Sequence, residues 1–168
     1  MRSLPLLDER IEARARATAA AHPFWPCREG CDDCCRSLAR VPEITEPEWS
    51  RLRDAIASLP EDQRRVVLDR MRGLSASDVK VTCPMLDRGR GACLVYDARP
   101  VACRTYGFYA ERDGGLHCAK VSAAVASHET EASPVVWGNG ESIADELRTL
   151  GEARSIVEWA GPLLERST

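Results

Sequence analysis

Residues 27–35, CREGCDDCC, place four of the chain's eight cysteines within nine positions. Such a pattern is typical of a disulfide knot, a redox or nucleophilic thiol site, or a set of metal ligands. A chain of 168 residues can bury a core without covalent cross-links. Its N-terminal segment is charged throughout, and no stretch has the roughly 18 apolar residues of a membrane span. We therefore expect a cytoplasmic protein without a membrane segment, in which disulfides are rare and clustered cysteines favour metal binding or catalysis.

The spacing of the cysteines favours metal ions that bind sulfur. Cys31 and Cys34 have the two-residue gap of a zinc knuckle. Together with Cys27 they have the C-x3-C-x2-C spacing that also holds iron–sulfur clusters, and Cys35 follows directly. Because adjacent side chains usually diverge, we expect Cys34 and Cys35 to serve different metal ions or different corners of one multinuclear centre. Eight thiolates would fill two all-cysteine zinc sites, or one cluster and one zinc site, and a smaller set with spare or bridging thiols also fits. The candidate ligands are Cys27, Cys31, Cys34, Cys35, Cys83, Cys93, Cys103 and Cys118.

Polar residues near the second cysteine set are candidates to stabilise a thiolate centre. Four thiolates around one divalent ion carry a net charge of about −2, which attracts cations and hydrogen-bond donors. The candidates for this role are Tyr96, Arg99, Arg104 and Tyr106. His117 could replace a thiolate as a ligand or lie beside the ligands, whereas His22 and His128 are expected at the surface.

Apolar spacing predicts a largely helical chain. We expect helices over residues 4–21, 46–58 and 60–73, the second beginning with a Thr45–Glu48 capping box and pairing with the third as a helical hairpin. Further helices are expected after Pro100, within residues 116–129, around Ile143 to Leu150, and from Ile156 onward, where Gly161 and Pro162 should interrupt the last one. "ERDGG" is expected to form a turn.

The segments "CPML" and "ACLVY" flank "DRGRG" and predict a small β-hairpin. The expected fold is therefore mainly α with this hairpin, a single domain over residues 1–168 with helices around a cysteine-rich metal site. The metal-binding region spans about residues 24–120, with helical extensions at both ends.

The order of these motifs resembles a known family. "CREGCDDCC", then "CPML", then "GACLVYDARPVACRTYGF" is similar to the YkgJ-like, or CxxCxxCC, cysteine-cluster family, whose members are described as chelating zinc or iron. Fixed partners such as Gly91, Tyr96, Arg99 and Pro100 make the resemblance specific. It implies that the cysteines bind zinc or iron ions, or an iron–sulfur cluster, and it implies no reaction. A similar domain occurs in flagellin lysine methylases, which leaves a protein lysine methyltransferase as an alternative.

Other functions find less support in the pattern. A thiol-redox role for Cys31 and Cys34 lacks the βαβ setting of such motifs, and Asp32 and Asp33 between them disfavour a reactive thiolate through charge repulsion. Enzymes that cleave S-adenosylmethionine by radical chemistry need a parallel barrel that the predicted elements do not form. No glycine-rich turn for a nucleotide-like cofactor is found, "GNG" at 138–140 being too short.

The net charge of −3 argues against nucleic-acid binding. Beyond the metal ion, the sequence indicates no substrate, protein partner or oligomeric state.

Overall fold

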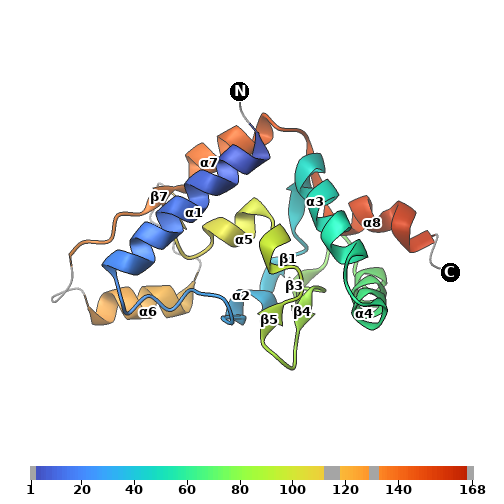
Figure 1. Ribbon diagram of the computed structural model, residues 1–168, viewed down its shortest axis with the longest axis horizontal. Coiled ribbons are helices and arrows are strands. Elements are labelled where there is room, and N and C mark those ends of the chain that lie inside the picture. Colours follow the sequence, from blue (N-terminus) through green and yellow to red (C-terminus); the bar gives the residue numbers. More distant parts are fainter. Residues whose placement is uncertain (1–2, 112–117, 129–132, 166–168) are drawn as a thin grey trace. The chain divides into compact units, whose positions relative to one another are not determined.

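The computed structural model describes residues 3–111, 118–128 and 133–165 (Figure 1). These residues form eight α-helices, a short 3-10 helix and four two-stranded sheets, so the expectation of a mainly α fold with a small β-hairpin is confirmed. The chain divides into two compact units, each made of two separate stretches. The first unit comprises residues 1–28 and 101–150, and the second comprises residues 29–100 and 151–168. The single domain over residues 1–168 stays a prediction.

The first unit is built on four helices. They are α1 (Leu4–Ala21), α5 (Val101–Thr105), α6 (Ala119–Ser127) and α7 (Gly140–Arg148). The helix predicted over residues 4–21 is therefore confirmed. Its buried residues Leu4, Leu7 and Ile11 pack with Val101 of α5 and Ile143 of α7. An ion pair between Arg10 and Glu146, at 2.8 Å, also joins α1 to α7.

A short parallel sheet completes the first unit. β6 (Tyr109–Ala110) pairs with β7 (Gly138–Asn139), directly before α7. A Cβ atom at Gly138 would overlap the ring of Tyr109, so this close approach needs glycine. Asn139 caps α7 by accepting a hydrogen bond from the Ser142 amide at 3.0 Å. "GNG" therefore contains β7 and the first residue of α7. The sequence did not predict β7, because only two residues of each strand pair.

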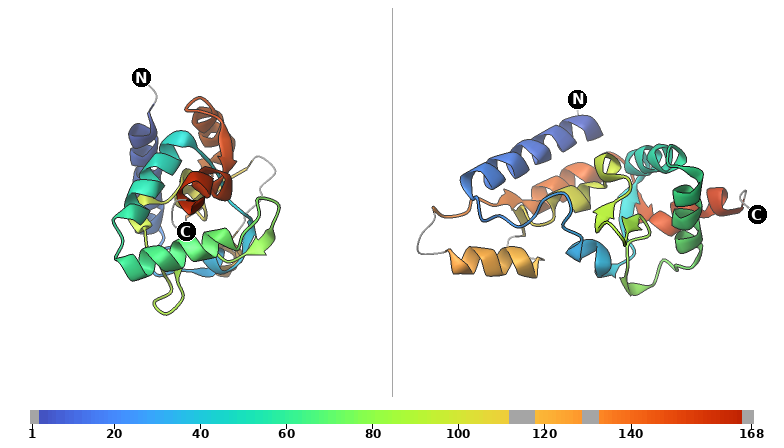
Figure 2. Two further views of the ribbon diagram at one scale, coloured as in Figure 1. Left: turned by 90° about the vertical axis from the view of Figure 1, so that its right-hand side faces the viewer. Right: turned by 60° about the horizontal axis from the view of Figure 1, so that its bottom comes forward.

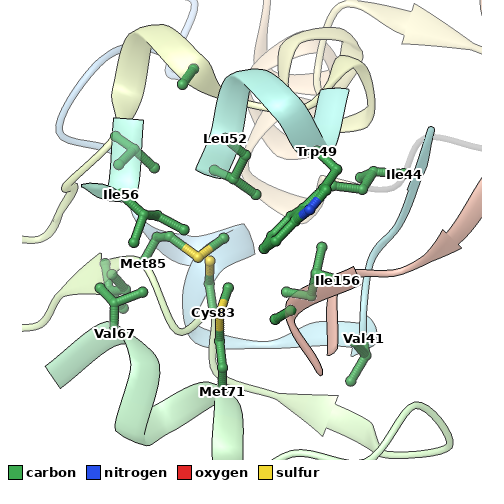
Figure 3. Packing of buried hydrophobic residues seen from close by; sticks show 14 of the residues in the cluster. Val41, Ile44, Trp49, Leu52, Ile56, Val67, Met71, Cys83, Met85 and Ile156 are labelled. Carbon is green, nitrogen blue, oxygen red and sulfur yellow. The ribbon is translucent and has the colours of Figure 1, made fainter. Parts of the chain in front are cut away.

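The second unit holds the larger core. Its helices are α2 (Asp33–Arg36), α3 (Glu46–Ala57), α4 (Glu61–Arg72), η1 (Tyr96–Ala98) and α8 (Ile156–Glu165). The predicted pair of helices over residues 46–58 and 60–73 is confirmed as α3 and α4, which contact each other, and α8 lies against α4 (Figure 2). Their apolar faces meet in one cluster that includes Leu52, Ile56, Val67, Met71 and Ile156 (Figure 3).

The predicted capping box starts α3. The amide and hydroxyl of Thr45 both donate to the Glu48 carboxylate, at 2.8 and 2.7 Å. Both residues are only 1% exposed, so the box satisfies buried polar groups at the helix start.

The sheets of the second unit are all antiparallel. β1 (Leu38–Arg40) pairs with β3 (Val79–Val81), β2 (Glu43–Thr45) with β8 (Ala153–Ser155), and β4 (Leu86–Asp87) with β5 (Ala92–Cys93). The last pair is the predicted β-hairpin, with strands shorter than the apolar runs suggested. The first two pairs were not predicted, because each strand is three residues long and its partner lies far away in the sequence.

The predicted interruption of the last helix is wrong. α8 continues through Gly161 and Pro162 to Glu165. Proline removes one backbone hydrogen bond, but packing against the core offsets this loss. Ile156 and Ala160 are fully buried, and the Trp159 indole donates to the Ile44 carbonyl at 2.8 Å.

Within the part of the chain that the structure describes, no helix combines the length and the apolar composition that a membrane span requires. The turn expected at "ERDGG" lies largely outside the described residues.

Candidate metal centre

The two units share the eight cysteines unequally. The second unit contains Cys31, Cys34, Cys35, Cys83 and Cys93, and the first contains Cys27, Cys103 and Cys118. All eight lie in the described residues, and none is in a disulfide. The thiols are therefore not linked in a disulfide knot in this structure.

Four cysteines of the second unit lie in α2, shortly before β4 and in β5. The Sγ atoms of Cys34 and Cys35 lie 4.0 Å apart. The amide of Cys83 donates to the Cys35 carbonyl at 2.7 Å, which fastens the start of the hairpin segment to α2. Cys93 lies in β5 opposite Leu86. We call these residues the four-thiol group: Cys34, Cys35, Cys83 and Cys93.

The Cys34 and Cys35 side chains do not diverge, and the expectation that they serve different metal ions or different corners of one multinuclear centre stays a prediction. Two thiolates on one tetrahedral zinc ion, with Zn–S bonds of about 2.3 Å, stand about 3.8 Å apart. The observed 4.0 Å is close to that spacing. The short helix α2 thus holds this pair at a separation that suits a shared metal ion.

The four sulfurs influence one another's ionisation. The hydrogen bond with Cys35, together with burial, raises the pKa of Cys34 far above its ordinary value. For Cys35 the hydrogen bond with Cys34 lowers the pKa, but the hydrogen bond with Cys83, burial and the charges of Cys83 and Cys93 raise it to about 12. Burial raises the pKa of Cys93, with a smaller contribution from the charge of Cys34. Without a cation, the raised pKa values of Cys34, Cys35 and Cys93 favour the protonated thiols at neutral pH.

The sulfurs do not yet converge on a single point. Within the described residues, no group of three or more Cys, His, Asp or Glu side chains is arranged to hold a metal ion. Cys83 is 7% exposed and belongs to the apolar cluster with Met71 and Met85 (Figure 3).

Tyr96 and Arg99 follow Cys93 in the chain and contact each other. The Arg99 guanidinium carbon is 3.5 Å from the centre of the Tyr96 ring, and Arg99 Nε donates to the Tyr96 carbonyl at 2.9 Å. The charge of Arg99 lowers the pKa of Cys93, opposing the effect of burial. This position fits the role predicted for Arg99 near thiolates.

Arg104 and Tyr106, the other two residues predicted to stabilise thiolates, lie in the first unit. Arg104, whose side chain is 9% exposed, forms ion pairs with Glu12 at 2.7 Å and Asp8 at 3.4 Å. These contacts bind α5 to α1 through carboxylates. Tyr106 contributes its backbone carbonyl, which accepts a hydrogen bond from Cys27 Sγ at 3.6 Å.

Cys27 also approaches Gly107 closely. A Cβ atom there would lie 3.2 Å from Cys27 Sγ, and Gly107 has a positive φ of 84°. Glycine is therefore needed at this position. Cys103 lies in α5, and Cys118 is the N-cap residue of α6.

The positions of the histidines differ in part from those predicted. His22 is only 4% exposed, so its predicted surface position is wrong. The Trp25 amide donates to the His22 carbonyl at 2.9 Å, and this turn packs the His22 ring near Phe24 and Trp25. His128, expected at the surface, is half-buried because its ring stacks on Phe24 at 4.2 Å. His117 lies outside the described residues.

Asp32 has a structural role that the sequence did not reveal. It forms an ion pair with Arg36 at 2.5 Å, and its carboxylate lies 3.1 Å from the Cβ position of Gly91 in the β4–β5 turn. Its side chain is 15% exposed, so the carboxylate does not point freely into water. The four-residue spacing of Asp32 and Arg36 was the available signal.

Comparisons with known proteins give one match. No curated protein and no solved structure matches this chain. A family model does match residues 26–131, which is more than half of the chain and includes all eight cysteines. The family carries the description "putative zinc- or iron-chelating domain". The chain therefore belongs to the CxxCxxCC family.

Proposed function

We propose that this protein binds zinc or iron through cysteine thiolates and that the four-thiol group of the second unit forms one such site. The observation that carries the proposal is the 4.0 Å separation of the Cys34 and Cys35 sulfurs. Cys83 is tied to the same short helix by a backbone hydrogen bond, and the hairpin carries Cys93. Soft thiolate ligands suit zinc, iron and iron–sulfur clusters.

The chemistry of the group fits a cation. Burial and mutual interaction disfavour ionisation of Cys34, Cys35 and Cys93 in the absence of metal. A bound cation reverses this by stabilising the thiolates, and the released protons go to solvent.

The remaining cysteines are included in the proposal. Cys27, Cys31, Cys103 and Cys118 all lie within the segment that the family model matches. We propose that they too bind metal, either as ions or as part of an iron–sulfur centre. A cytoplasmic location fits this role, because reducing conditions keep thiols available for metal.

The enzyme alternatives gain no support from the described fold. The four sheets of the described residues have two strands each, whereas a βα barrel or a nucleotide-binding fold needs an extended parallel sheet. The described parallel pairing, β6 with β7, joins two residues of each strand. A metal-binding role that requires no extended sheet is the better-supported function.

The first test is elemental analysis and an ultraviolet–visible spectrum of protein purified without oxygen. We expect zinc in a colourless sample, or iron in a coloured sample whose sulfide content reports a cluster. Cys34→Ser should lower the metal content, whereas Ser37→Ala, an exposed neighbour at the end of α2, should not. Metal-free wild-type protein that stays metal-free after addition of Zn²⁺ or Fe²⁺ would contradict the proposal.

A further inference from the structure

Two neighbouring thiols of the second unit lie close enough to bind one atom together. The Sγ atoms of Cys34 and Cys35 are 4.0 Å apart, and both residues are partly exposed. Within the part of the chain that the structure describes, no group of three or more Cys, His, Asp or Glu side chains is arranged to hold a metal ion. The geometry of this pair therefore suits a ligand that needs two sulfurs.

The backbone around α2 holds the pair in place. The Arg36 amide donates to the Asp32 carbonyl at 2.9 Å, and the side chains of these two residues form an ion pair at 2.5 Å. The Cys83 amide donates to the Cys35 carbonyl at 2.7 Å. Because the two thiols are already positioned, a ligand bound by one sulfur meets the second at high effective concentration.

The number of sulfurs and their separation together select the chemistry of the ligand. Zinc takes four ligands in structural sites, and a linear two-coordinate ion such as Cu(I) or Hg(II) holds its sulfurs on opposite sides, farther apart than this pair. Trivalent arsenic is soft and pyramidal, so it holds sulfurs side by side. When one of its three positions carries a carbon group, two positions remain for sulfur. A small change in the side-chain torsions of Cys34 and Cys35 closes the remaining difference in separation.

We propose that Cys34 and Cys35 form a binding site for a trivalent organoarsenical, whose arsenic carries one carbon group and one doubly bonded oxygen. Each thiol sulfur forms one As–S bond, the bond from arsenic to oxygen breaks, and the oxygen leaves as water with the two thiol protons. Arsenic stays trivalent throughout, so the step needs no oxidant or reductant. The inference does not depend on the proposed function, because it requires two thiols and no metal ion.

The competing pair is Cys31 with Cys34. These residues have the two-residue gap of a C-x2-C motif, but Cys31 lies outside α2, whereas Cys34 and Cys35 share this helix. Both pairs contain Cys34. Replacing the other member of each pair therefore distinguishes them.

The test uses phenylarsine oxide on the reduced, metal-free, full-length chain, and intact mass spectrometry counts the bound phenylarsenic groups. Cys34→Ser and Cys35→Ser should each bind one group fewer than wild type, whereas Cys31→Ser should bind as many as wild type. Excess dithiothreitol should release the group from wild type and excess glutathione should not, because a dithiol competes with a two-sulfur chelate far better than a monothiol does.

Mapping on wild-type protein keeps the test independent of how the variants fold. Bound phenylarsine oxide should protect its two thiols from N-ethylmaleimide, and dithiothreitol then exposes them to iodoacetamide. Trypsin releases Cys31, Cys34 and Cys35 together in residues 29–36, and fragmentation locates each label. We expect the second label on Cys34 and Cys35. Protection of Cys31 and Cys34 with maleimide on Cys35 would overturn the assignment.

The outcomes separate this inference from the proposed function. A wild-type chain that binds no phenylarsine oxide overturns the inference even if it binds Zn²⁺ or iron. A loss in Cys31→Ser with no loss in Cys35→Ser also overturns it, because arsenic would then bridge the C-x2-C pair. Binding of phenylarsine oxide at Cys34 and Cys35 by a chain that takes up neither Zn²⁺ nor iron supports the inference and contradicts the proposed function.

Discussion

The Sγ atoms of Cys34 and Cys35 lie 4.0 Å apart although the two residues are adjacent in the short helix α2. The amide of Cys83 reaches the Cys35 carbonyl, so the pair is fixed relative to the β4–β5 hairpin before any metal binds. This relationship makes the loss of one sulfur informative, because the supporting backbone would remain.

Replacing a single cysteine should lower both metal content and stability. Cys34→Ser removes a ligand of the four-thiol group, and Cys103→Ser removes a predicted ligand in α5. Because metal-binding free energy contributes to folding free energy, each variant should melt at a lower temperature than wild type. Elemental analysis and thermal unfolding of the same samples measure both effects. Full metal loading with unchanged melting in both variants would contradict the assignment.

Metal binding should strengthen as pH rises. The pKa of Cys35 is raised to about 12, and those of Cys34 and Cys93 are also raised, so protons compete with the metal at neutral pH. Each thiolate ligand formed releases a proton, and the apparent Zn²⁺ affinity should therefore increase from pH 6 to pH 8. Zn²⁺ competition assays across this range measure the slope. A flat profile would mean that the ligands are already ionised.

Without metal, the raised thiol pKa values predict the opposite dependence for stability. A group whose pKa is higher in the folded state stabilises the fold below its unfolded pKa. That contribution is lost as pH rises from the ordinary thiol range of about 8.5 toward the raised values. The metal-free protein should accordingly melt at lower temperature at pH 10 than at pH 7. Cys34→Ser should reduce this alkaline loss, and thermal unfolding of both metal-free proteins is the measurement.

The sequence predicts the helices and one hairpin because their signals are local. Apolar spacing, the Thr45–Glu48 box and Pro100 at the start of a helix each act within a few residues. The pairing of β2 with β8 depends on residues more than one hundred positions apart, and no local pattern indicates it. The interruption predicted at Gly161 and Pro162 is wrong, because the buried packing of Ile156 and the hydrogen bond of Trp159 stabilise α8 and do not show in the local sequence.

The candidate site was predictable in its residue types and less so in its geometry. Spacing identified the cysteines, and their fixed partners identified the family. The close approach of the Cys34 and Cys35 sulfurs depends on side-chain orientation within α2, which adjacency alone does not determine. His22 is buried because a turn packs its ring against aromatic side chains. The prolines that follow it in the sequence suggested an exposed loop and gave no sign of this packing.

Stability should also depend on a carboxylate at the start of α8. The hydroxyl and amide of Ser155 hold the pKa of Glu158 below its usual value, and the amide donates to its carboxylate at 2.8 Å. A depressed pKa contributes stability above the unfolded pKa and loses it as pH falls through the folded value. Glu158→Gln should therefore flatten the decrease in melting temperature below pH 5. Glu152→Gln, at an exposed neighbour paired with Arg154, serves as the control and should keep the wild-type profile.

Two glycines with opposite surroundings give the last prediction. A Cβ atom at Gly138 would overlap the Tyr109 ring, whereas one at Gly161 in α8 would meet nothing within 4 Å. Gly138→Ala should destabilise the fold by about 1–3 kcal/mol, as expected for overpacking at a buried position. Gly161→Ala should stabilise it by about 0.5–1 kcal/mol, since alanine restricts the unfolded chain and favours helix. Urea unfolding of both variants and wild type measures the difference. Equal stability of the two variants would contradict the close approach of β7 to Tyr109. The added methyl group would then cost no more at Gly138 than at Gly161.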